Sequence, residues 1–215
     1  MSIIEGLDLH TYKKKKENED FIRIYNNFLD KDLCDLLINF YNKNEKHECK
    51  LTTMADEDGT EQIDGIRKSN GLNVDNLKRL KINNTETSII FNIIFNIFDK
   101  GIKRYLNEFK YCINVKEFVS EELIITKYIK NKGYFKWHKD RGLMKNSANH
   151  RYLSAILYLN DVDIGGETEF KYQNKIIKPL KGQLLIFPSD WTYLHRGRIP
   201  ESNDKYICNN FFELS

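Results

Sequence analysis

The hydrophobic pattern of the first half of the chain predicts helices. An alternating stretch at residues 21–25 predicts a short strand, and Asp30 then stands as an N-cap before apolar residues that recur at helical spacing over residues 33–40. Residues 45–80 are polar and irregular, and a longer helical pattern follows over residues 85–109. Gly101 marks an end or a break of that helix. We expect its apolar stripe to be buried against the rest of the protein: Ile90, Ile93, Ile94 and Ile97.

From about residue 112 the pattern changes to short runs of β-branched and aromatic residues. Turn signals such as "NKG", "NDVDIGG" and "PESND" separate these runs. Several short strands at close spacing, with no helical pattern between them, predict a sandwich, barrel or jelly roll. We therefore expect one α+β domain over residues 1–215, in which residues 1–111 give mainly helical support and residues 112–215 form the β core.

Composition and charge exclude several classes of protein. With 215 residues and 40% hydrophobic residues, the chain can bury a substantial core. Its net charge is only +3, and the run "KKKK" is followed at once by "ENED", which favours a solvated segment over a nucleic-acid-binding arm. No stretch resembles a signal peptide or a membrane span, and the four cysteines lack metal-binding spacing. We expect a soluble cytoplasmic protein that binds neither nucleic acid nor membrane.

The segment "GYFKWHKDRG" contains the strongest chemical signal. His138 and Asp140 are two residues apart at the end of a predicted strand, so both side chains would project from one face. Such a pair alone is more often a surface contact than a metal site. A third ligand changes this interpretation, and His195, just after the apolar strand "QLLIFP", is the best placed. We expect His10, His47 and His150 to be solvated or in turns. Two histidines and one carboxylate are the ligands of non-haem Fe(II) oxygenases.

The spacing and the flanking motifs together resemble a known family. The HxD pair is followed after 54 residues by His195 and ten residues later by Lys205, while Tyr128 precedes His138 by ten residues. The segments "GGETEF" and "KPLKGQLLIF" also match the family pattern. The chain resembles the 2-oxoglutarate- and Fe(II)-dependent dioxygenases, and among them the prolyl 4-hydroxylases, of the compact kind found in viruses, phages and bacteria. The resemblance implies a double-stranded β-helix (jelly-roll) core with supporting N-terminal helices.

The resemblance also implies a role for each residue of the motifs. His138, Asp140 and His195 would bind Fe(II), while Lys205 and Tyr128 would bind the far carboxylate of 2-oxoglutarate. With O2 as the second cosubstrate and ascorbate as a reductant, such an enzyme hydroxylates an unactivated C–H bond. From the residues alone, Lys205 also fits an exposed lysine of an edge strand, and Tyr128 fits an ordinary core tyrosine.

The same resemblance points to peptidyl proline in a peptide or protein as the substrate. Arg67 and Ser69 in "GIRKSNGL", part of a substrate loop, and Arg151 occupy positions that contact substrate in prolyl 4-hydroxylases, although an arginine paired with Asp or Glu at the surface explains either arginine equally simply. Phe211 stands where the collagen-type enzymes often carry tryptophan. A lysyl hydroxylase, a hydroxylase of free amino acids or other small molecules, and a non-catalytic jelly-roll binding module are the alternatives. If the source is a virus or phage, the protein would act in the host cell.

Overall fold

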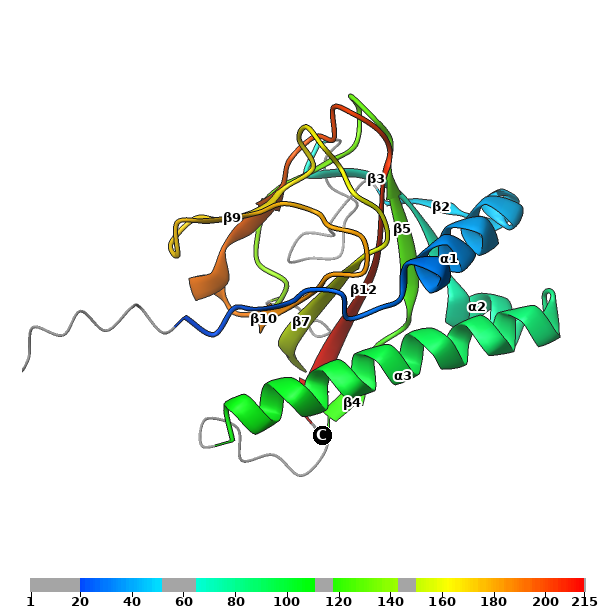
Figure 1. Cartoon of the computed structure of the whole chain (residues 1–215), viewed down its shortest axis with the longest axis horizontal. Helices are drawn as coiled ribbons and strands as arrows, with labels where there is room; N and C mark the ends of the chain where they lie inside the picture. Colours follow the sequence, from blue (N-terminus) through cyan, green and yellow to red (C-terminus); the bar gives the residue numbers. More distant parts are fainter. Residues whose placement is uncertain (1–19, 52–64, 111–117, 143–149, 215) are drawn as a thin grey trace, which may run out of the picture.

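The computed structural model describes residues 20–51, 65–110, 118–142 and 150–214, and within them helices lie on one side of a strongly folded sheet (Figure 1). The helices are α1 (Lys31–Lys43), α2 (Val74–Arg79) and α3 (Asn84–Glu108), with short 3-10 helices at Glu45–His47 and Trp191–Tyr193. The strands are β1 (Arg23–Tyr25), β2 (Cys49–Leu51), β3 (Arg67–Asn73), β4 (Phe118–Ser120), β5 (Ile124–Tyr128), β6 (Tyr134–His138), β7 (Arg151–Tyr158), β8 (Thr168–Phe170), β9 (Lys175–Ile177), β10 (Leu184–Pro188), β11 (His195–Gly197) and β12 (Lys205–Leu214).

The strands pair side by side in one sheet that folds into two facing layers. The larger layer has the order β1-β10-β7-β12-β5-β3, and the smaller layer continues it as β6-β11-β8-β9. Strand β3 joins the layers, because its second half pairs with β5 and its first two residues pair with β6. Every pairing between these strands is antiparallel. This is the predicted double-stranded β-helix with supporting helices, and the fold prediction is confirmed.

The larger layer separates two hydrophobic cores because side chains alternate along its strands. On β7, Leu153, Ala155 and Leu157 belong to the core beneath the helices, whereas Tyr158 belongs to the core between the layers. Facing Tyr158 from the smaller layer are side chains such as Phe170. One core therefore attaches the helices, and the other fills the barrel beside its polar pocket.

Helices α1 and α3 form largely as the pattern predicts. The Asp30 carboxylate accepts a hydrogen bond from the backbone N–H of Asp32, as expected of an N-cap. Helix α3 runs below β7 and β12 in Figure 1, and its Phe98 ring meets the Phe212 ring of β12 edge-on at 6.4 Å. The expected stripe is only partly right. Ile90 and Ile94 are fully buried, whereas Ile93 and Ile97 lie at its margins and are half-buried.

Gly101 neither ends nor breaks α3. The helix continues to Glu108, and Gly101 lies where it approaches β10 most closely. A Cβ atom at this position would stand 2.5 Å from Cδ2 of Leu184. The glycine therefore reflects close packing of a helix against a sheet, which the sequence pattern alone does not distinguish from a helix end.

The prediction that residues 45–80 are irregular is wrong for the part that the structure describes. This region contains β2, β3 and α2, whereas the short strand predicted at residues 21–25 is present as β1. Strand β3, with the sequence RKSNGLN, has few apolar residues, because backbone pairing with β5 and β6 holds it in place and its Arg67 borders the pocket between the layers. The β core therefore begins well before residue 112.

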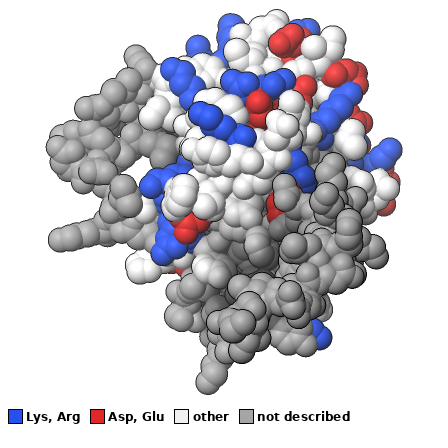
Figure 2. Space-filling view, turned by 90° about the vertical axis from the view of Figure 1, so that its left-hand side faces the viewer, with Lys and Arg blue, Asp and Glu red and all other residues white. Residues whose placement is uncertain are grey.

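The surface carries charges of both signs. On the face shown in Figure 2, Lys and Arg side chains are interspersed with Asp and Glu. Among the described residues, no helix combines the length and the hydropathy needed to cross a membrane. Cys34, Cys49 and Cys208 are free thiols, whereas Cys112 and His10 lie outside the described residues.

Candidate functional site

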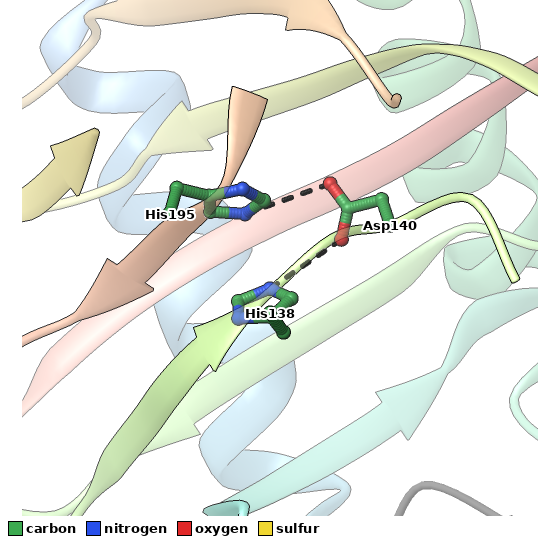
Figure 3. Close-up of side chains that lie close together, drawn as sticks. All are labelled: His138, Asp140 and His195. Carbon is green, nitrogen blue, oxygen red and sulfur yellow. Dashed lines mark ion pairs between the residues drawn. The ribbon is translucent and has the colours of Figure 1, made fainter. Parts of the chain in front are cut away.

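Two neighbouring strands of the smaller layer bring the three candidate ligands together. His195, at the start of β11, lies directly opposite His138, at the end of β6. Asp140 follows β6 by two residues and faces both imidazoles, with Oδ1 3.5 Å from Nε2 of His138 and Oδ2 3.6 Å from Nε2 of His195 (Figure 3). The ligand atoms of all three lie within 4.8 Å of one another. The prediction that Asp140 belongs to the strand is wrong, because β6 ends at His138.

Backbone carbonyls orient both imidazoles. Nδ1 of His138 lies 2.7 Å from the carbonyl oxygen of Lys136, and Nδ1 of His195 lies 3.0 Å from that of Tyr193. Because a carbonyl oxygen only accepts hydrogen bonds, each Nδ1 carries a hydrogen, which leaves Nε2 as the ring nitrogen that can offer a lone pair to a metal ion. Both lone pairs therefore belong to the nitrogen atoms that approach Asp140.

The charge states of Asp140 and His195 suit a divalent cation. Burial by itself raises the pKa of Asp140, but the charges of His195 and His138 and a hydrogen bond from Ser154 hold that pKa well below its usual range. Burial and the nearby His138 lower the pKa of His195 to about 4. At neutral pH the cluster thus offers a carboxylate and a neutral imidazole.

The oxygen–nitrogen distances within the cluster also suit one metal ion. They are shorter than two metal–ligand bonds of about 2.0–2.2 Å placed end to end, so one ion fits between these atoms.

Ser154 and Ser189 support Asp140, and the sequence analysis missed both. The Ser154 hydroxyl donates to Oδ2 of Asp140 at 2.7 Å, and it lies 2.7 Å from the Ser189 hydroxyl. Both serines are buried. A signal was present for Ser154, because it is the polar residue in the apolar strand "RYLSAILYL" and therefore needs a partner inside the protein.

Aromatic rings form the walls around the histidines. The Phe135 ring stacks on His138 with centroids 3.4 Å apart, and the Phe187 ring meets His195 edge-on at 4.8 Å. These contacts restrict rotation of the imidazoles and exclude water from their outer sides. The cluster therefore opens toward the pocket between the two layers.

Lys205 lines the same pocket and is buried, so it is not an exposed lysine of an edge strand. Its ammonium donates to the carbonyl oxygen of Gly166 at 2.7 Å and faces the rings of Tyr128 and Tyr158 at 5.5 and 5.3 Å. Burial lowers the pKa of Lys205 to about 7, against the opposing charge of Glu167. Since an isolated buried ammonium is costly, this environment suits the carboxylate of a ligand.

The remaining candidates lie at different sides of the site. Tyr128 lines the pocket and pairs with Lys205 across β5 and β12. Arg67 also lines it, lies over Phe135, and donates from Nε to the hydroxyl of buried Ser69 at 2.9 Å. The structure therefore brings Arg67 to the pocket wall, while Ser69 contacts that arginine and is not part of the lining.

Arg151 lies beside the pocket rather than in its lining. It pairs with Glu121 and also approaches the backbone of Asp140. His47 and His150 are both exposed, as expected. Contacts of Arg67, Ser69 and Arg151 with a substrate stay predictions.

Comparisons with known proteins agree with this geometry. Residues 123–213 match the model of the 2OG-Fe(II) oxygenase superfamily, which confirms the resemblance seen in the motifs. No curated protein is similar enough in sequence to match the chain. Among solved structures, a viral collagen prolyl hydroxylase from Paramecium bursaria Chlorella virus-1, in complex with 2-oxoglutarate, is 19% identical with a TM-score of 0.63, and the alignment covers 92% of this chain and 98% of that chain.

Two further structures share the fold at similar distance. A prolyl-4-hydroxylase from Pseudomonas putida is 17% identical with a TM-score of 0.60, and the alignment covers 92% of this chain and 94% of that one. A prolyl hydroxylase from Trichoplax adhaerens, in complex with a peptide fragment of the hypoxia inducible factor oxygen degradation domain, is 17% identical with a TM-score of 0.66. There the alignment covers 91% of this chain and 84% of that chain.

Proposed function

We propose that the protein is a 2-oxoglutarate- and Fe(II)-dependent dioxygenase that hydroxylates an unactivated C–H bond. The observation that carries the proposal is that the His138–Asp140–His195 cluster opens on the same pocket as the buried ammonium of Lys205. A divalent cation and a dicarboxylate are the two ligands that this arrangement suits. The superfamily match over residues 123–213 supports the same conclusion.

His138, Asp140 and His195 would hold Fe(II) through two nitrogen atoms and one carboxylate oxygen. Three protein ligands leave further coordination positions free for cosubstrate and oxygen. When bound, iron with 2-oxoglutarate and O2 supplies an oxidant that converts C–H to C–OH, and the second oxygen atom of O2 leaves in succinate as CO2 is released. Asp140 would supply the negative charge that offsets the charge of the metal, and the two imidazoles would supply the remaining donors.

Lys205 and Tyr128 would position the cosubstrate. The Lys205 ammonium pairs with the far carboxylate of 2-oxoglutarate, and the Tyr128 hydroxyl donates to the same group. Phe135, Phe170 and Phe187 surround the histidines and keep water from the reacting centre. Ascorbate would serve as the reductant that restores Fe(II) after turnover without substrate.

We further propose that the substrate is a proline residue in a peptide or protein. Arg67 at the pocket wall supplies a guanidinium, which suits the carbonyl groups of a peptide backbone, and the Ser69 hydroxyl that accepts from Arg67 would be the second polar group on this side. The similar structures from Chlorella virus, Pseudomonas putida and Trichoplax adhaerens are all prolyl hydroxylases, and the last of them binds a peptide. These resemblances support a peptide substrate in preference to a free amino acid.

Formation of succinate tests the proposal. Purified protein with Fe(II), 2-oxoglutarate and ascorbate should form succinate faster when proline-rich peptides are present, and those peptides should gain 16 mass units. A mass shift on lysine-containing peptides or on free amino acids instead would retain the dioxygenase and replace the substrate. If the protein binds Fe(II) and 2-oxoglutarate yet forms no succinate with any of these compounds or with a cell lysate, a binding module is the better description.

A further inference from the structure

Asp140 needs support from outside its own strand. Because β6 ends at His138, strand pairing does not fix the position of Asp140. Hydrogen bonds to other segments of the chain hold this part instead. Ser154 donates to the carboxylate of Asp140 at 2.7 Å, the backbone N–H of Arg141 donates to the carbonyl oxygen of Ser189 at 2.9 Å, and the Arg151 guanidinium donates from NH1 to the carbonyl oxygen of Asp140 at 3.3 Å.

The Arg151 guanidinium is itself held from two sides. Glu121 accepts two parallel hydrogen bonds, from Nε at 2.6 Å and from NH2 at 2.7 Å. On its flat face the guanidinium carbon lies 3.6 Å from the centre of the Phe211 ring. A bidentate pair and a ring contact fix the plane of an arginine more firmly than one hydrogen bond does. The side chains of Arg151 and Glu121 are also mostly buried, at 21% and 15% exposure.

Glu121 is anchored in turn to the strand that carries Phe211. Its backbone N–H donates to the carbonyl oxygen of Phe211 at 2.9 Å, so the carboxylate and the ring that contact Arg151 belong to one local unit. The chain of contacts thus runs from the segment between β4 and β5, through Arg151 on β7, to the backbone of Asp140. These contacts connect the larger layer to Asp140, which follows β6 of the smaller layer and takes no part in its strand pairing.

We propose that the Glu121–Arg151 pair is a positioning device that holds the backbone of Asp140 so that its carboxylate faces both histidines. This inference rests on the proposed function, because it assigns a purpose to Asp140 as a metal ligand. It gives Arg151 a role distinct from the substrate contact that the family resemblance predicts. Three of the five N–H groups of Arg151 are engaged by Glu121 and Asp140. A role in positioning Asp140 would affect metal affinity, whereas a substrate contact would affect the KM for a peptide.

The affinity for Co(II), followed by its visible absorption in the absence of cosubstrates, tests the device directly. Loss of an outer partner of a metal ligand typically weakens metal binding about 10- to 100-fold, and Arg151→Ala should fall in this range. Glu121→Gln, which keeps one acceptor for Arg151, should have a smaller effect. Arg151→Lys should restore part of the affinity, since it keeps a donor but not the fork. The double variant Arg151→Ala with Glu121→Gln should bind Co(II) about as weakly as Arg151→Ala alone, because both substitutions break the same pair.

Arg23 provides a matched control. It pairs with Glu108 at 2.8 Å, donates to the backbone carbonyls of Asp20 and Ile22, and lies over the Phe109 ring at 4.3 Å. Arg23→Ala therefore removes the same kinds of contact from partners other than Asp140. It should lower the thermal midpoint to a similar degree as Arg151→Ala and leave Co(II) affinity unchanged.

Each outcome bears on a different claim. If wild-type protein binds no divalent cation, the proposed function fails and the positioning role fails with it. If wild type binds Co(II) and folded Arg151→Ala, Arg151→Lys and Glu121→Gln bind it equally well, the positioning role alone is overturned. An increase in KM for a proline-rich peptide in those variants, with unchanged Co(II) affinity, would instead assign Arg151 to the substrate. Equal losses of Co(II) affinity in Arg151→Ala and Arg23→Ala would reduce the effect to general stability.

Discussion

The two faces of the larger layer are made by alternate residues of the same strands, yet their chemistry differs. On β12, Cys208 and Phe212 pack beneath the helices, whereas Lys205, Asn209 and Phe211 line the pocket. Apart from a few polar residues, the helix side is a continuous apolar core. The pocket side carries the buried charges and hydroxyls of the candidate site. Neighbouring residues on one strand therefore serve stability and chemistry separately.

This separation explains how the barrel tolerates buried polar groups. Burying an ammonium such as that of Lys205 or a carboxylate such as that of Asp140 costs free energy unless each is paired. The apolar core under the helices supplies stability that does not depend on those groups. Substitutions on the pocket side should consequently alter ligand binding more than folding, and substitutions on the helix side should do the reverse.

The largest effect is expected on the pocket side, from Asp140→Ala. This change removes the anionic ligand from between His138 and His195 and leaves only two imidazoles, which hold a divalent cation weakly. Succinate formation should be abolished, and Co(II) affinity should fall sharply. The variant should still fold, since the core beneath the helices is untouched.

His150→Ala is the control for this prediction. His150 is exposed and lies outside the cluster, so its loss should leave metal binding nearly unchanged. If Asp140→Ala kept near wild-type turnover, the assignment of the three ligands would be wrong.

Lys205→Ala should produce the next largest effect. Removing one partner of a buried charge pair typically costs about 3–5 kcal/mol, which corresponds to two to four powers of ten in affinity. The KM for 2-oxoglutarate should rise by this factor while Co(II) affinity changes little. Lys205→Arg should recover part of the loss, because the charge is kept in a different geometry.

Arg198 gives the comparison for Lys205. It pairs with Glu169 at 2.8 Å and does not line the pocket among the described residues. Arg198→Ala should therefore leave the 2-oxoglutarate requirement close to that of wild type. A larger effect for Arg198→Ala than for Lys205→Ala would contradict the proposed cosubstrate anchor.

A pair of substitutions on β7 compares the two faces within four residues. Leu157→Ala, on the helix side, should lower the free energy of unfolding by about 2–5 kcal/mol through loss of buried volume. Ser154→Ala, on the pocket side, should change that free energy by no more than about 1 kcal/mol but weaken Co(II) binding roughly tenfold. Urea denaturation and metal titration of both variants measure the contrast. It would disappear if Ser154→Ala unfolded as readily as Leu157→Ala or bound metal normally.

Much of the site was predictable because short-range motifs encode it. The HxD pair gives two candidates within three residues, and His195 begins β11, the strand that pairs antiparallel with β6. The alternating β pattern and the helical pattern before it predict an α+β protein with a sandwich, barrel or jelly roll, and the family resemblance implies the jelly roll. These features depend on local periodicity, which sequence displays directly.

The missed features depend on distant contacts. Strand β3 is stabilised by backbone pairing with β5 and β6, so its polar sequence carries little strand signal. Gly101 was interpreted as a helix end because its partner, Leu184, is far away in sequence. The pairing of Arg151 with Glu121 crosses thirty positions, and no motif connects them. Long-range packing, rather than propensity, decides each of these cases.

The smallest expected effect concerns pH and sharpens the role of Lys205. With its pKa lowered to about 7 by burial, Lys205 is largely neutral above pH 7 when no ligand is bound. A carboxylate partner favours the ammonium, so binding of 2-oxoglutarate above pH 7 requires uptake of a proton. Affinity should be nearly constant below pH 7 and fall roughly fivefold between pH 7 and pH 8. Titration calorimetry with Mn(II)-loaded protein from pH 6.5 to 8.5 measures this dependence. Lys205→Arg, whose guanidinium stays charged throughout, should bind more weakly than wild type near pH 7 but lose the dependence on pH. A wild-type affinity that stays constant across this range would show that the buried amine does not exchange a proton when the cosubstrate binds.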